Sequence, residues 1–318
     1  MAEIGCAGIL VEDTFCGPMR ELPHEGLLTA IDSMPTRAGG CAANVAIDLA
    51  RQDFTVDVVG CLGHDGSGNA LLACLENHQI GCERVIITDA YPTSRTVILL
   101  VEGQDRRYIH VFGANRAFMV GHIQRDWLAS LKVFYLGGLF AMPAIHTEEL
   151  LDLLKFCRSR NIVTVVDVVM PQQTDGIEDI RPLLPYIDYF LPNDDESRQM
   201  TSLTDPLDQL RTFQAAGAHT VIVTRGKAGA IAAKGGKYWQ CGTYPAQVLD
   251  PSGSGDAFSG GVITGILRGW DMPQTLRYAA ALGASATRAV GTTDGVFTAA
   301  EAEAFVASHV LPVSAGSL

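Results

Sequence analysis

The residues best suited to chemistry lie at positions 250–256, which read Asp-Pro-Ser-Gly-Ser-Gly-Asp and run straight into an apolar segment with helical spacing. Glycines let backbone N–H groups approach a ligand closely. The first N–H groups of a helix have no internal partner and favour negative charge. The turn formed by Gly253, Ser254 and Gly255 is therefore suited to hold an anion, most simply phosphate. Asp256 stands at the same helix start. Because a carboxylate repels phosphate, its better role is that of a general base that takes a proton from an attacking hydroxyl.

Two other glycine motifs are excluded at this stage. The dinucleotide fingerprint G-x-G-x-x-G would need glycine where Phe258 stands. A P-loop ending at Gly226 and Lys227 would need glycine at Val221 and a hydroxyl residue at Ala228. The remaining alternative is an ordinary helix N-terminus that follows a glycine turn, with an acidic residue near its cap.

The stretch Asp250–Asp256 resembles the D-T-x-G-A-G-D signature of the ribokinase-like (PfkB) carbohydrate kinases. The resemblance implies that the Gly-x-Gly turn is an anion hole and that Asp256 is the catalytic base. Pro251 and Ser252 replace the residues that usually follow the first Asp of the signature. The sequence nevertheless keeps that acid, as Asp250, and a nearby hydroxyl, as Ser252. In cation-activated members this region shares a K⁺ site with a later glycine-rich loop, here residues 290–295. Asp250 and Ser252 could therefore contribute to a K⁺ site.

A second glycine pair, Gly39-Gly40, is followed by Asn44 at the start of another expected helix. From local sequence this is also compatible with an ordinary turn and cap. The segment resembles the G-G-x-x-x-N motif of the same family, which implies that a sugar lies against the glycines and that Asn44 donates to a sugar hydroxyl. The family also carries a sugar-binding Asp near the end of the first strand, here Asp13. A carboxylate can accept both hydrogen bonds of a vicinal diol. Asn115, which closes a later β-rich segment, is predicted to join this substrate-binding group.

Two further loops resemble the nucleotide end of these kinases. Asn193 and Glu196 match an N-x-x-E motif that lies near the phosphates and Mg²⁺-bound water, although an acidic loop that caps a helix would look the same locally. Mg²⁺ keeps several of its waters, so Glu196 could act on it through water. The loop that starts at Thr224 leads toward the adenine and ribose in the family. The predicted ATP-binding set is Asn193, Glu196, Thr224, Gly226, Gly229, Gly253 and Gly255.

The composition limits the class of protein. The chain has 318 residues, of which 47% are hydrophobic and 18% charged, with a net charge of −12. The negative charge argues against nucleic-acid and anionic-membrane partners. Eight scattered cysteines contain no C-x-x-C pair, which is typical of reduced thiols in a cytoplasmic protein. We find neither a signal-peptide pattern at the N-terminus nor an apolar run long enough for a bilayer.

Expected helices and strands alternate from residue 120 onward, which predicts an α/β fold with a mostly parallel central sheet and helices on both faces. The resemblance makes this fold ribokinase-like, with a small β lid. We assign 13–32 and 91–115 to the lid, and 1–12, 33–90 and 116–318 to the nucleotide- and substrate-binding core. In open α/β sheets, ligands bind beyond the carboxyl ends of the strands. Pro312–Leu318 is expected to be a disordered tail.

The resemblance implies an ATP- and Mg²⁺-dependent kinase, with K⁺ as a further candidate ion, that phosphorylates a hydroxyl of a small sugar or sugar derivative. Ribokinases tend to carry a sugar-contacting Glu after the strand expected at Val133–Leu136. Here that segment reads Gly-Gly-Leu-Phe, so a sugar other than ribose is favoured. A nucleoside kinase of the adenosine, inosine or pseudouridine type is the main alternative, and a sugar-binding regulator without catalysis is a second. Lids of this family often pair, so a homodimer through the lid is a further hypothesis.

Overall fold

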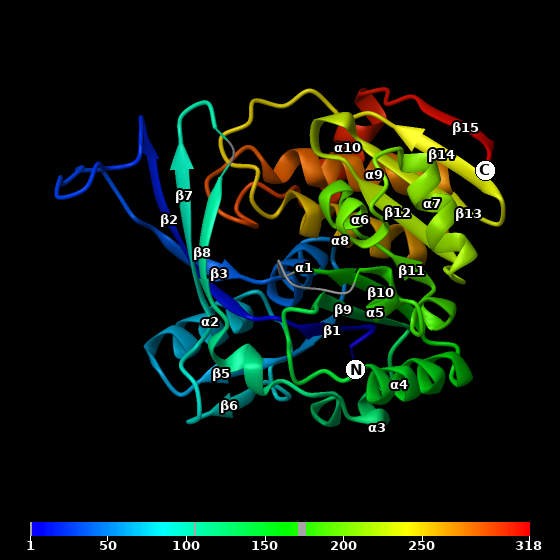
Figure 1. Cartoon of the computed structure of the whole chain (residues 1–318), viewed down its shortest axis with the longest axis horizontal. Helices are drawn as coiled ribbons and strands as arrows, with labels where there is room; N and C mark the ends of the chain where they lie inside the picture. The colour runs from blue at the N-terminus through cyan, green and yellow to red at the C-terminus, as the bar shows by residue number, and fades with distance from the viewer. Residues whose placement is uncertain (1, 105, 171–175) are drawn as a thin grey trace.

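A computed structural model of the chain describes residues 2–104, 106–170 and 176–318 (Figure 1). Their strands form one nine-stranded sheet, one four-stranded sheet and a two-stranded sheet made of β5 (Cys61–Gly63) and β6 (Ile86–Thr88). The nine-stranded sheet has the order β15-β14-β13-β12-β11-β10-β9-β1-β4. Its strands are β1 (Ile4–Gly8), β4 (Val56–Val59), β9 (Val133–Leu139), β10 (Val163–Val168), β11 (Tyr189–Phe190), β12 (Thr220–Thr224), β13 (Ala230–Lys234), β14 (Lys237–Cys241) and β15 (Val313–Ser317).

The pairing directions divide the large sheet into two parts. Every pair from β4 through β1, β9, β10 and β11 to β12 is parallel. The pairs from β12 through β13 and β14 to β15 are antiparallel. The prediction of a mostly parallel sheet is therefore confirmed, with an antiparallel extension at one edge.

Helices cover both faces of the sheet because the side chains of its strands alternate between two apolar cores. Phe134 and Leu136 of β9 lie in one core, with residues of α3, α4 and α7. Val133 and Tyr135 point the other way, into a core shared with α1, α8 and α9. The helices are α1 (Cys41–Ala50), α2 (Gly66–Asn77), α3 (Arg125–Leu128), α4 (Thr147–Ser159), α5 (Ile177–Ile180), α6 (Asp194–Thr201), α7 (Pro206–Ala215), α8 (Ser254–Leu267), α9 (Met272–Ala286) and α10 (Ala299–Ser308).

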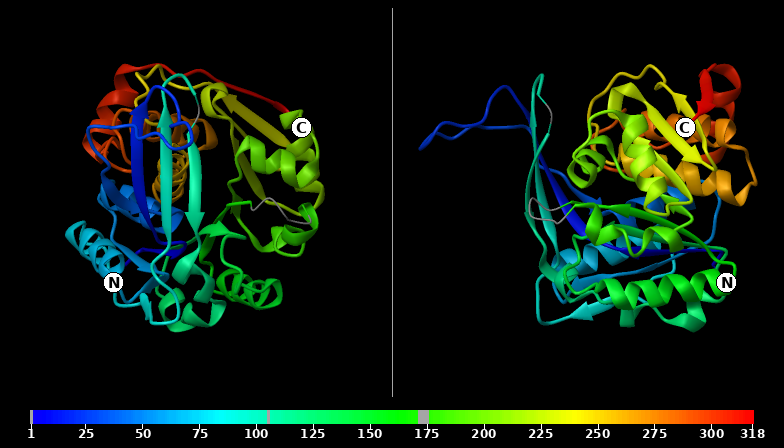
Figure 2. Two further views of the ribbon diagram at one scale, coloured as in Figure 1. Left: turned by 60° about the vertical axis from the view of Figure 1, so that its left-hand side comes forward. Right: turned by 45° about the vertical axis from the view of Figure 1, so that its right-hand side comes forward.

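The four-stranded sheet stands away from the body of the molecule (Figure 2). Its order is β3-β2-β7-β8, with β2 (Val11–Met19), β3 (Thr36–Gly39), β7 (Arg95–Val101) and β8 (Arg107–Val111). These strands overlap the two segments assigned to the lid, but β3 and the first residues of β2 fall in ranges that the sequence assigned to the core. The sheet takes in β3 because it pairs with β2 just before the chain enters α1. The division into core and lid domains stays a prediction.

The end of the chain differs from expectation. Val313–Ser317 is not a disordered tail but forms β15, paired with β14 from Lys237 to Cys241. Without this strand, β14 would present a row of unpaired N–H and C=O groups at the sheet edge, and the C-terminal segment satisfies them. None of the helices in the described ranges has both the length and the apolar character needed to cross a membrane.

Candidate active site

The turn before α8 has the geometry of an anion-binding loop. Gly253 adopts φ 75°, and a β-carbon there would lie 2.0 Å from the backbone oxygen of Thr292, so only glycine fits. A β-carbon on Gly255 would meet nothing within 4 Å. Helix α8 begins at Ser254 without a side-chain cap. Its first N–H groups can therefore serve an external anion, as predicted for Gly253, Ser254 and Gly255.

Asp256 lies in the first turn of α8 and faces α1. Asn44 donates from Nδ2 to Oδ2 of Asp256 at 2.7 Å, and Thr292 Oγ1 lies 2.9 Å from Oδ1 of Asn44. Burial raises the pKa of Asp256, while the hydrogen bonds from Asn44 and Cys41 lower it. The Asn44 contact brings the two strongest sequence motifs together and fixes the direction in which the carboxylate points.

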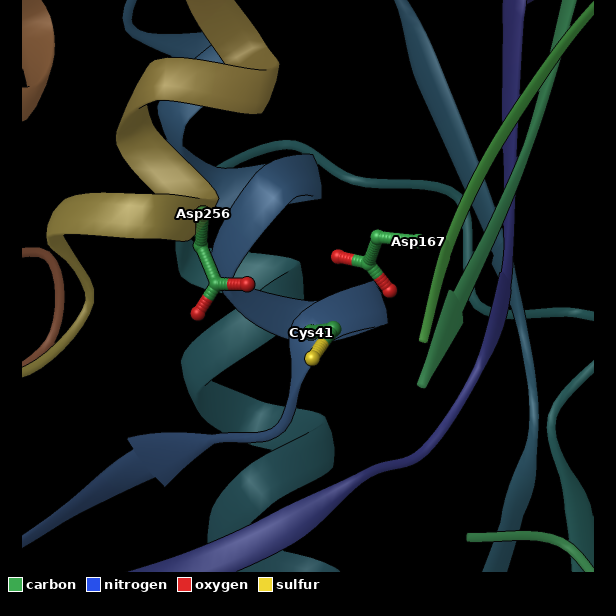
Figure 3. Close-up of side chains that lie close together, drawn as sticks. All are labelled: Cys41, Asp167 and Asp256. Carbon is green, nitrogen blue, oxygen red and sulfur yellow. The ribbon is translucent and has the colours of Figure 1, made fainter. Parts of the chain in front are cut away.

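Sequence reasoning missed two residues beside this carboxylate, Cys41 and Asp167 (Figure 3). Cys41 is the first residue of α1, and Asp167 lies near the end of β10. Asp167 accepts from the hydroxyl of Tyr135 and, at 2.6 Å, from the backbone N–H of Gly138. Burial, and then the charge of Asp256, raise the pKa of Asp167 to about 7. The available signal was a single carboxylate in an otherwise almost wholly apolar strand.

The predicted substrate residues lie together, with one exception. A β-carbon on Gly39 would lie 1.9 Å from Oδ2 of Asp13 and would displace that carboxylate. One on Gly40 would lie 2.5 Å from the backbone oxygen of Ile9, so the fold requires glycine at position 40. Burial raises the pKa of Asp13 to about 7; a hydrogen bond with Thr96 opposes this, and the charge of Asp256 adds to it. The charge of Asp256 thus reaches Asp13.

Asn115 is the exception. Its side chain is fully buried, accepts from the N–H of Leu10 at 3.1 Å and donates to the carbonyl oxygen of the same residue at 3.1 Å. Both ends of its amide are therefore used to hold the chain between β1 and β2. The contact holds the segment that leads to Asp13 on β2, and a direct role of Asn115 in substrate binding stays a prediction.

The predicted nucleotide residues follow β11 and β12, whose carboxyl ends lie side by side. Asn193 and Glu196 form a reciprocal cap on α6, with bonds of 2.9 and 2.8 Å, so the alternative of an acidic helix cap is present. Asn193 also forms a bridge with Thr224. Burial raises the pKa of Glu196 to about 8, opposed by the bond from Asn193 and supported by the charges of Asp167 and Asp256. The cap therefore does not remove Glu196 from the site, because the charges of Asp167 and Asp256 both act on its carboxylate.

The loop after β12 contains two glycines in left-handed conformations, Gly226 (φ 50°) and Gly229 (φ 86°). A β-carbon on Gly229 would lie 2.0 Å from the backbone oxygen of Cys241, whereas the same position on Gly226 is open. Gly229 is thus required by the fold, since the chain passes close to Cys241 of β14 as it enters β13.

Asp250 and Ser252 are both buried just before the anion-binding turn. Asp250 accepts from the N–H of Ser252 at 2.9 Å and from the N–H of Gly291 at 3.1 Å, which ties the turn to the loop after α9. Ser252 Oγ has no hydrogen-bond partner in the described part of the chain, although the residue is only 3% exposed. An orphaned buried hydroxyl beside a carboxylate is compatible with a cation ligand.

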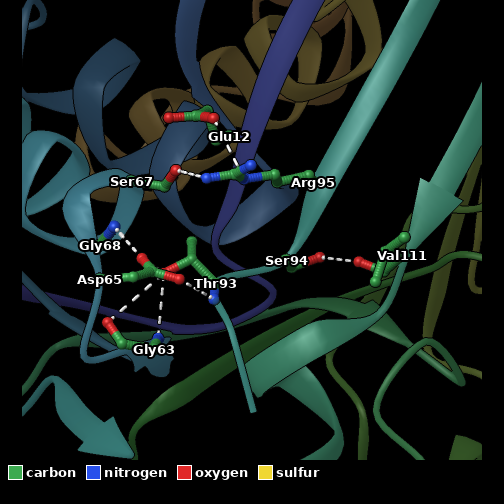
Figure 4. A network of polar contacts seen from close by, with 9 residues as sticks. All are labelled: Glu12, Gly63, Asp65, Ser67, Gly68, Thr93, Ser94, Arg95 and Val111. Atoms are coloured by element: carbon green, nitrogen blue, oxygen red, sulfur yellow. Dashed lines mark hydrogen bonds and ion pairs between the residues drawn. The ribbon is translucent and has the colours of Figure 1, made fainter.

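The base of the lid is held by a separate polar network (Figure 4). Asp65 caps α2 through the N–H of Gly68 at 2.8 Å and binds both the N–H and the hydroxyl of Thr93, at 2.8 and 2.7 Å. Arg95, at the start of β7, forms an ion pair with Glu12 on β2 at 3.4 Å. The network fixes the entry of β7 next to the strand that carries Asp13.

Comparison with known proteins identifies the family and the fold. The model of the pfkB family carbohydrate kinases matches residues 6–299. The chain is 27% identical over 262 residues to the ATP-dependent 6-phosphofructokinase of Thermoanaerobacterium thermosaccharolyticum, covering 80% of each chain. It is 25% identical over 246 residues to the cytidine kinase of Thermococcus kodakarensis, covering 76% of this chain and 84% of that one. The ribokinase of Arabidopsis thaliana in complex with ribose and ATP superposes with a TM-score of 0.82 at 22% identity, over 96% of this chain and 98% of that one.

The chain therefore belongs to the pfkB family of carbohydrate kinases. It is an ATP-dependent phosphotransferase that acts on a hydroxyl of a small sugar or sugar derivative. The ribokinase-like fold expected from the sequence is confirmed.

Proposed function

We propose that Asp256 is the general base of this kinase and that the backbone N–H groups of the turn Gly253–Gly255 stabilise the transferring phosphoryl group. The observation that carries the proposal is the 2.7 Å bond from Asn44 to Asp256. This bond joins two helix starts. Asn44 lies at the start of α1, after the glycine pair that is expected to hold the acceptor, and Asp256 lies at the start of α8, which is suited to hold phosphate. A hydroxyl bound beside Asn44 can thus give its proton to Asp256 while its oxygen faces the start of α8.

Mg²⁺ fits the nucleotide end of the site, where Glu196 feels the charges of Asp167 and Asp256. When bound, the ion neutralises charge on the ATP phosphates. Glu196 would hold its water shell, and Asn193 orients Glu196 through the reciprocal cap. Backbone N–H groups at the start of α8 would stabilise the charge on the transferring phosphoryl group. Phosphoryl transfer depends mainly on such positioning and electrostatic stabilisation. Thr224, Gly226 and Gly229 would border the nucleoside part of ATP.

We infer that the acceptor is a sugar or sugar derivative other than ribose. Asp13 and Asn44 offer an acceptor and a donor for adjacent hydroxyls, and Gly39 and Gly40 let the ring lie against the backbone. The segment at the end of β9 contributes Gly137 and Gly138, which have no side chain to contact a sugar. The similarity to a cytidine kinase keeps a nucleoside acceptor as the second candidate.

The test is a comparison of kcat/KM across ketohexoses, aldoses, sugar phosphates and sugar acids, with adenosine, inosine, cytidine and pseudouridine in parallel. We expect a non-ribose sugar or sugar derivative to give the highest value. A nucleoside preferred by tenfold or more, about 1.4 kcal/mol of transition-state binding, would favour the second candidate. Tight sugar binding without any phosphate transfer would instead favour a regulator.

We also infer a homodimer built through the lid. Strand β8 is the edge of the lid sheet, and its Tyr108, Ile109 and Val111 are more than half exposed, at 54, 62 and 57%. Apolar side chains on an open edge favour pairing with another chain. Light scattering of the purified protein and of an Ile109→Lys variant tests this, and a wild type that is monomeric at micromolar concentration would contradict it.

The free state of all eight cysteines supports a reducing, cytoplasmic location.

A further inference from the structure

Three side chains that can bind a metal converge in the active site, and the kinase chemistry described above uses only one of them. Cys41 comes from the start of α1, Asp167 from β10 and Asp256 from the first turn of α8 (Figure 3). The Sγ of Cys41 and one carboxylate oxygen of each aspartate all lie within 4.8 Å of one another. Figure 3 shows the two carboxylates facing each other, with the sulfur of Cys41 beside the space between them.

The negative charge of this cluster is poorly compensated. Among the described residues, neither Asp167 nor Asp256 forms an ion pair with a lysine, arginine or histidine. Arg106, which lies on the lid, contributes a positive charge that lowers the pKa of Asp256. Burial raises the pKa of the Cys41 thiol well above its usual value, and the nearby charges of Asp167 and Asp256 raise it further. A bound cation would relieve the repulsion among these groups.

The surroundings of the cluster already orient its members. Both oxygens of Asp167 accept hydrogen bonds, one from the hydroxyl of Tyr135 and one from the N–H of Gly138. Asp256 accepts a hydrogen bond from Asn44. The backbone of Gly137 approaches so closely that a β-carbon there would lie 2.9 Å from Cβ of Cys41. Metal ligands in proteins are typically fixed by such outer contacts, which reduces the cost of bringing the ligands together.

We propose that Cys41, Asp167 and Asp256 form an inhibitory binding site for Zn²⁺. A thiolate with two carboxylates suits Zn²⁺, whereas Mg²⁺ prefers oxygen and water ligands. Three protein ligands would leave a fourth position for water, and a small rotation of the side chains would close the set to Zn–S and Zn–O distances of about 2.3 and 2.0 Å. Binding requires the Cys41 thiol to lose its proton to solvent, so one proton or more is released for each ion bound.

The consequence for the kinase follows from the position of Asp256. A carboxylate that coordinates Zn²⁺ cannot take a proton from the acceptor hydroxyl, and the ion fills the space that this hydroxyl must enter. Inhibition is therefore expected to be competitive with the acceptor sugar. Because the thiolate selects for the softer ion, Mg²⁺ in large excess should weaken the inhibition only slightly.

Direct binding tests the site without relying on catalysis. We would titrate ZnCl₂ into the intact protein without nucleotide or sugar, follow the heat by calorimetry in buffers of different ionisation enthalpy, and compare Cys41→Ser with Cys74→Ser. Cys74 is a matched control, because it is a helical, half-exposed cysteine that lies outside the cluster. We expect one site per chain, proton release, and at least tenfold weaker binding in Cys41→Ser but not in Cys74→Ser. Co²⁺ in place of Zn²⁺ should give a thiolate charge-transfer absorption band that Cys41→Ser lacks.

Asp167→Asn provides a second variant in case Cys41→Ser is poorly folded, and it should also weaken Zn²⁺ binding. Equal Zn²⁺ affinity in wild type and Cys41→Ser, or the absence of the Co²⁺ band in the wild type, would overturn the proposal. So would inhibition that is unaffected by the acceptor concentration. A protein that binds Zn²⁺ as expected but phosphorylates no sugar would contradict the proposed function and leave this site in place.

Discussion

The backbone oxygen of Thr292 lies where a side chain on Gly253 would have to be, 2.0 Å from the ideal β-carbon position. Thr292 also contacts Asn44, through Oγ1 at 2.9 Å. One residue of the loop after α9 therefore supports both the phosphate-binding turn and the amide that orients Asp256. The two ends of the reaction, donor and acceptor, share this support, which comes from a loop that contributes no group to the proposed chemistry.

Gly253→Ala should damage the turn, since alanine disfavours φ 75° and its methyl group would collide with backbone rather than with a movable side chain. We expect a lower melting temperature and a loss of about 10²–10³ in kcat, the range for losing a donor that stabilises the transition state. Gly255→Ala is the matched comparison, because its methyl group meets open space. Thermal unfolding should show no loss for Gly255→Ala, and equal melting temperatures for the two variants would contradict the account.

Asp256→Asn tests the proposed base. The amide keeps the size of the side chain and can still bind Asn44 after a flip, so the fold and ATP affinity should change little. We expect kcat to fall by about 10²–10⁴, the contribution of a positioned acid–base group. Single-turnover kinetics with saturating acceptor measure this directly, and near-normal turnover would remove Asp256 from the role.

Individual residues show which parts of the site can be predicted from the sequence. Gly253, Asn44 and Asp256 could be found because a helix start leaves a local signature of glycine, cap and apolar spacing. Asp167 could not be assigned a role, since its contacts with Tyr135 and Gly138 and its approach to Asp256 depend on how distant elements pack. Nothing local in the sequence indicates that the amide of Asn115 binds the backbone of Leu10, because that contact joins segments far apart in the chain.

Strand β13 shows the same limit for the fold. Its sequence, Ala-Ile-Ala-Ala-Lys, has low β propensity, and its strand structure comes from pairing with β12 and β14. The tail was misjudged for the same reason, because only the open edge of β14 makes a strand of Val313–Ser317. In both segments, pairing with neighbouring strands determines the strand structure.

Potassium should activate the enzyme if the orphaned hydroxyl of Ser252 is a cation ligand. Asp250 ties the turn before α8 to Gly291, so an ion bound between these segments would order the anion-binding turn without touching the acceptor. We expect a higher kcat in K⁺ than in Na⁺ or Tris at fixed ionic strength, and a smaller K⁺ effect in Ser252→Ala. Equal rates in all three buffers would exclude this role.

Asp48 offers a test of how charge burial limits stability. It lies within α1, is fully buried, and neither carboxylate oxygen has a hydrogen-bond partner among the described residues. Burial, and then the charge of Asp256, raise its pKa well above the ordinary value, while Arg51 opposes the shift. The folded protein therefore holds a proton that the unfolded chain releases above about pH 4. The resulting stability is complete below that pH and is lost as the pH rises toward the raised pKa, at about 1.4 kcal/mol per pH unit.

Asp48→Asn cannot titrate, so its unfolding free energy should fall less steeply than that of the wild type as the pH rises above about 5. Urea unfolding at several pH values measures the two slopes. Asp65→Asn is the control of opposite sign: burial of Asp65 is outweighed by its bonds from Thr93 and Gly68, so its pKa is lowered and its contribution is lost as the pH falls. We therefore expect the loss of unfolding free energy in Asp65→Asn to become smaller toward acid pH. The unfolding free energy of Asp48→Asn should instead rise relative to that of the wild type toward alkaline pH. Parallel slopes for wild type and Asp48→Asn would mean that Asp48 is ionised in the folded protein, through a partner such as an internal water.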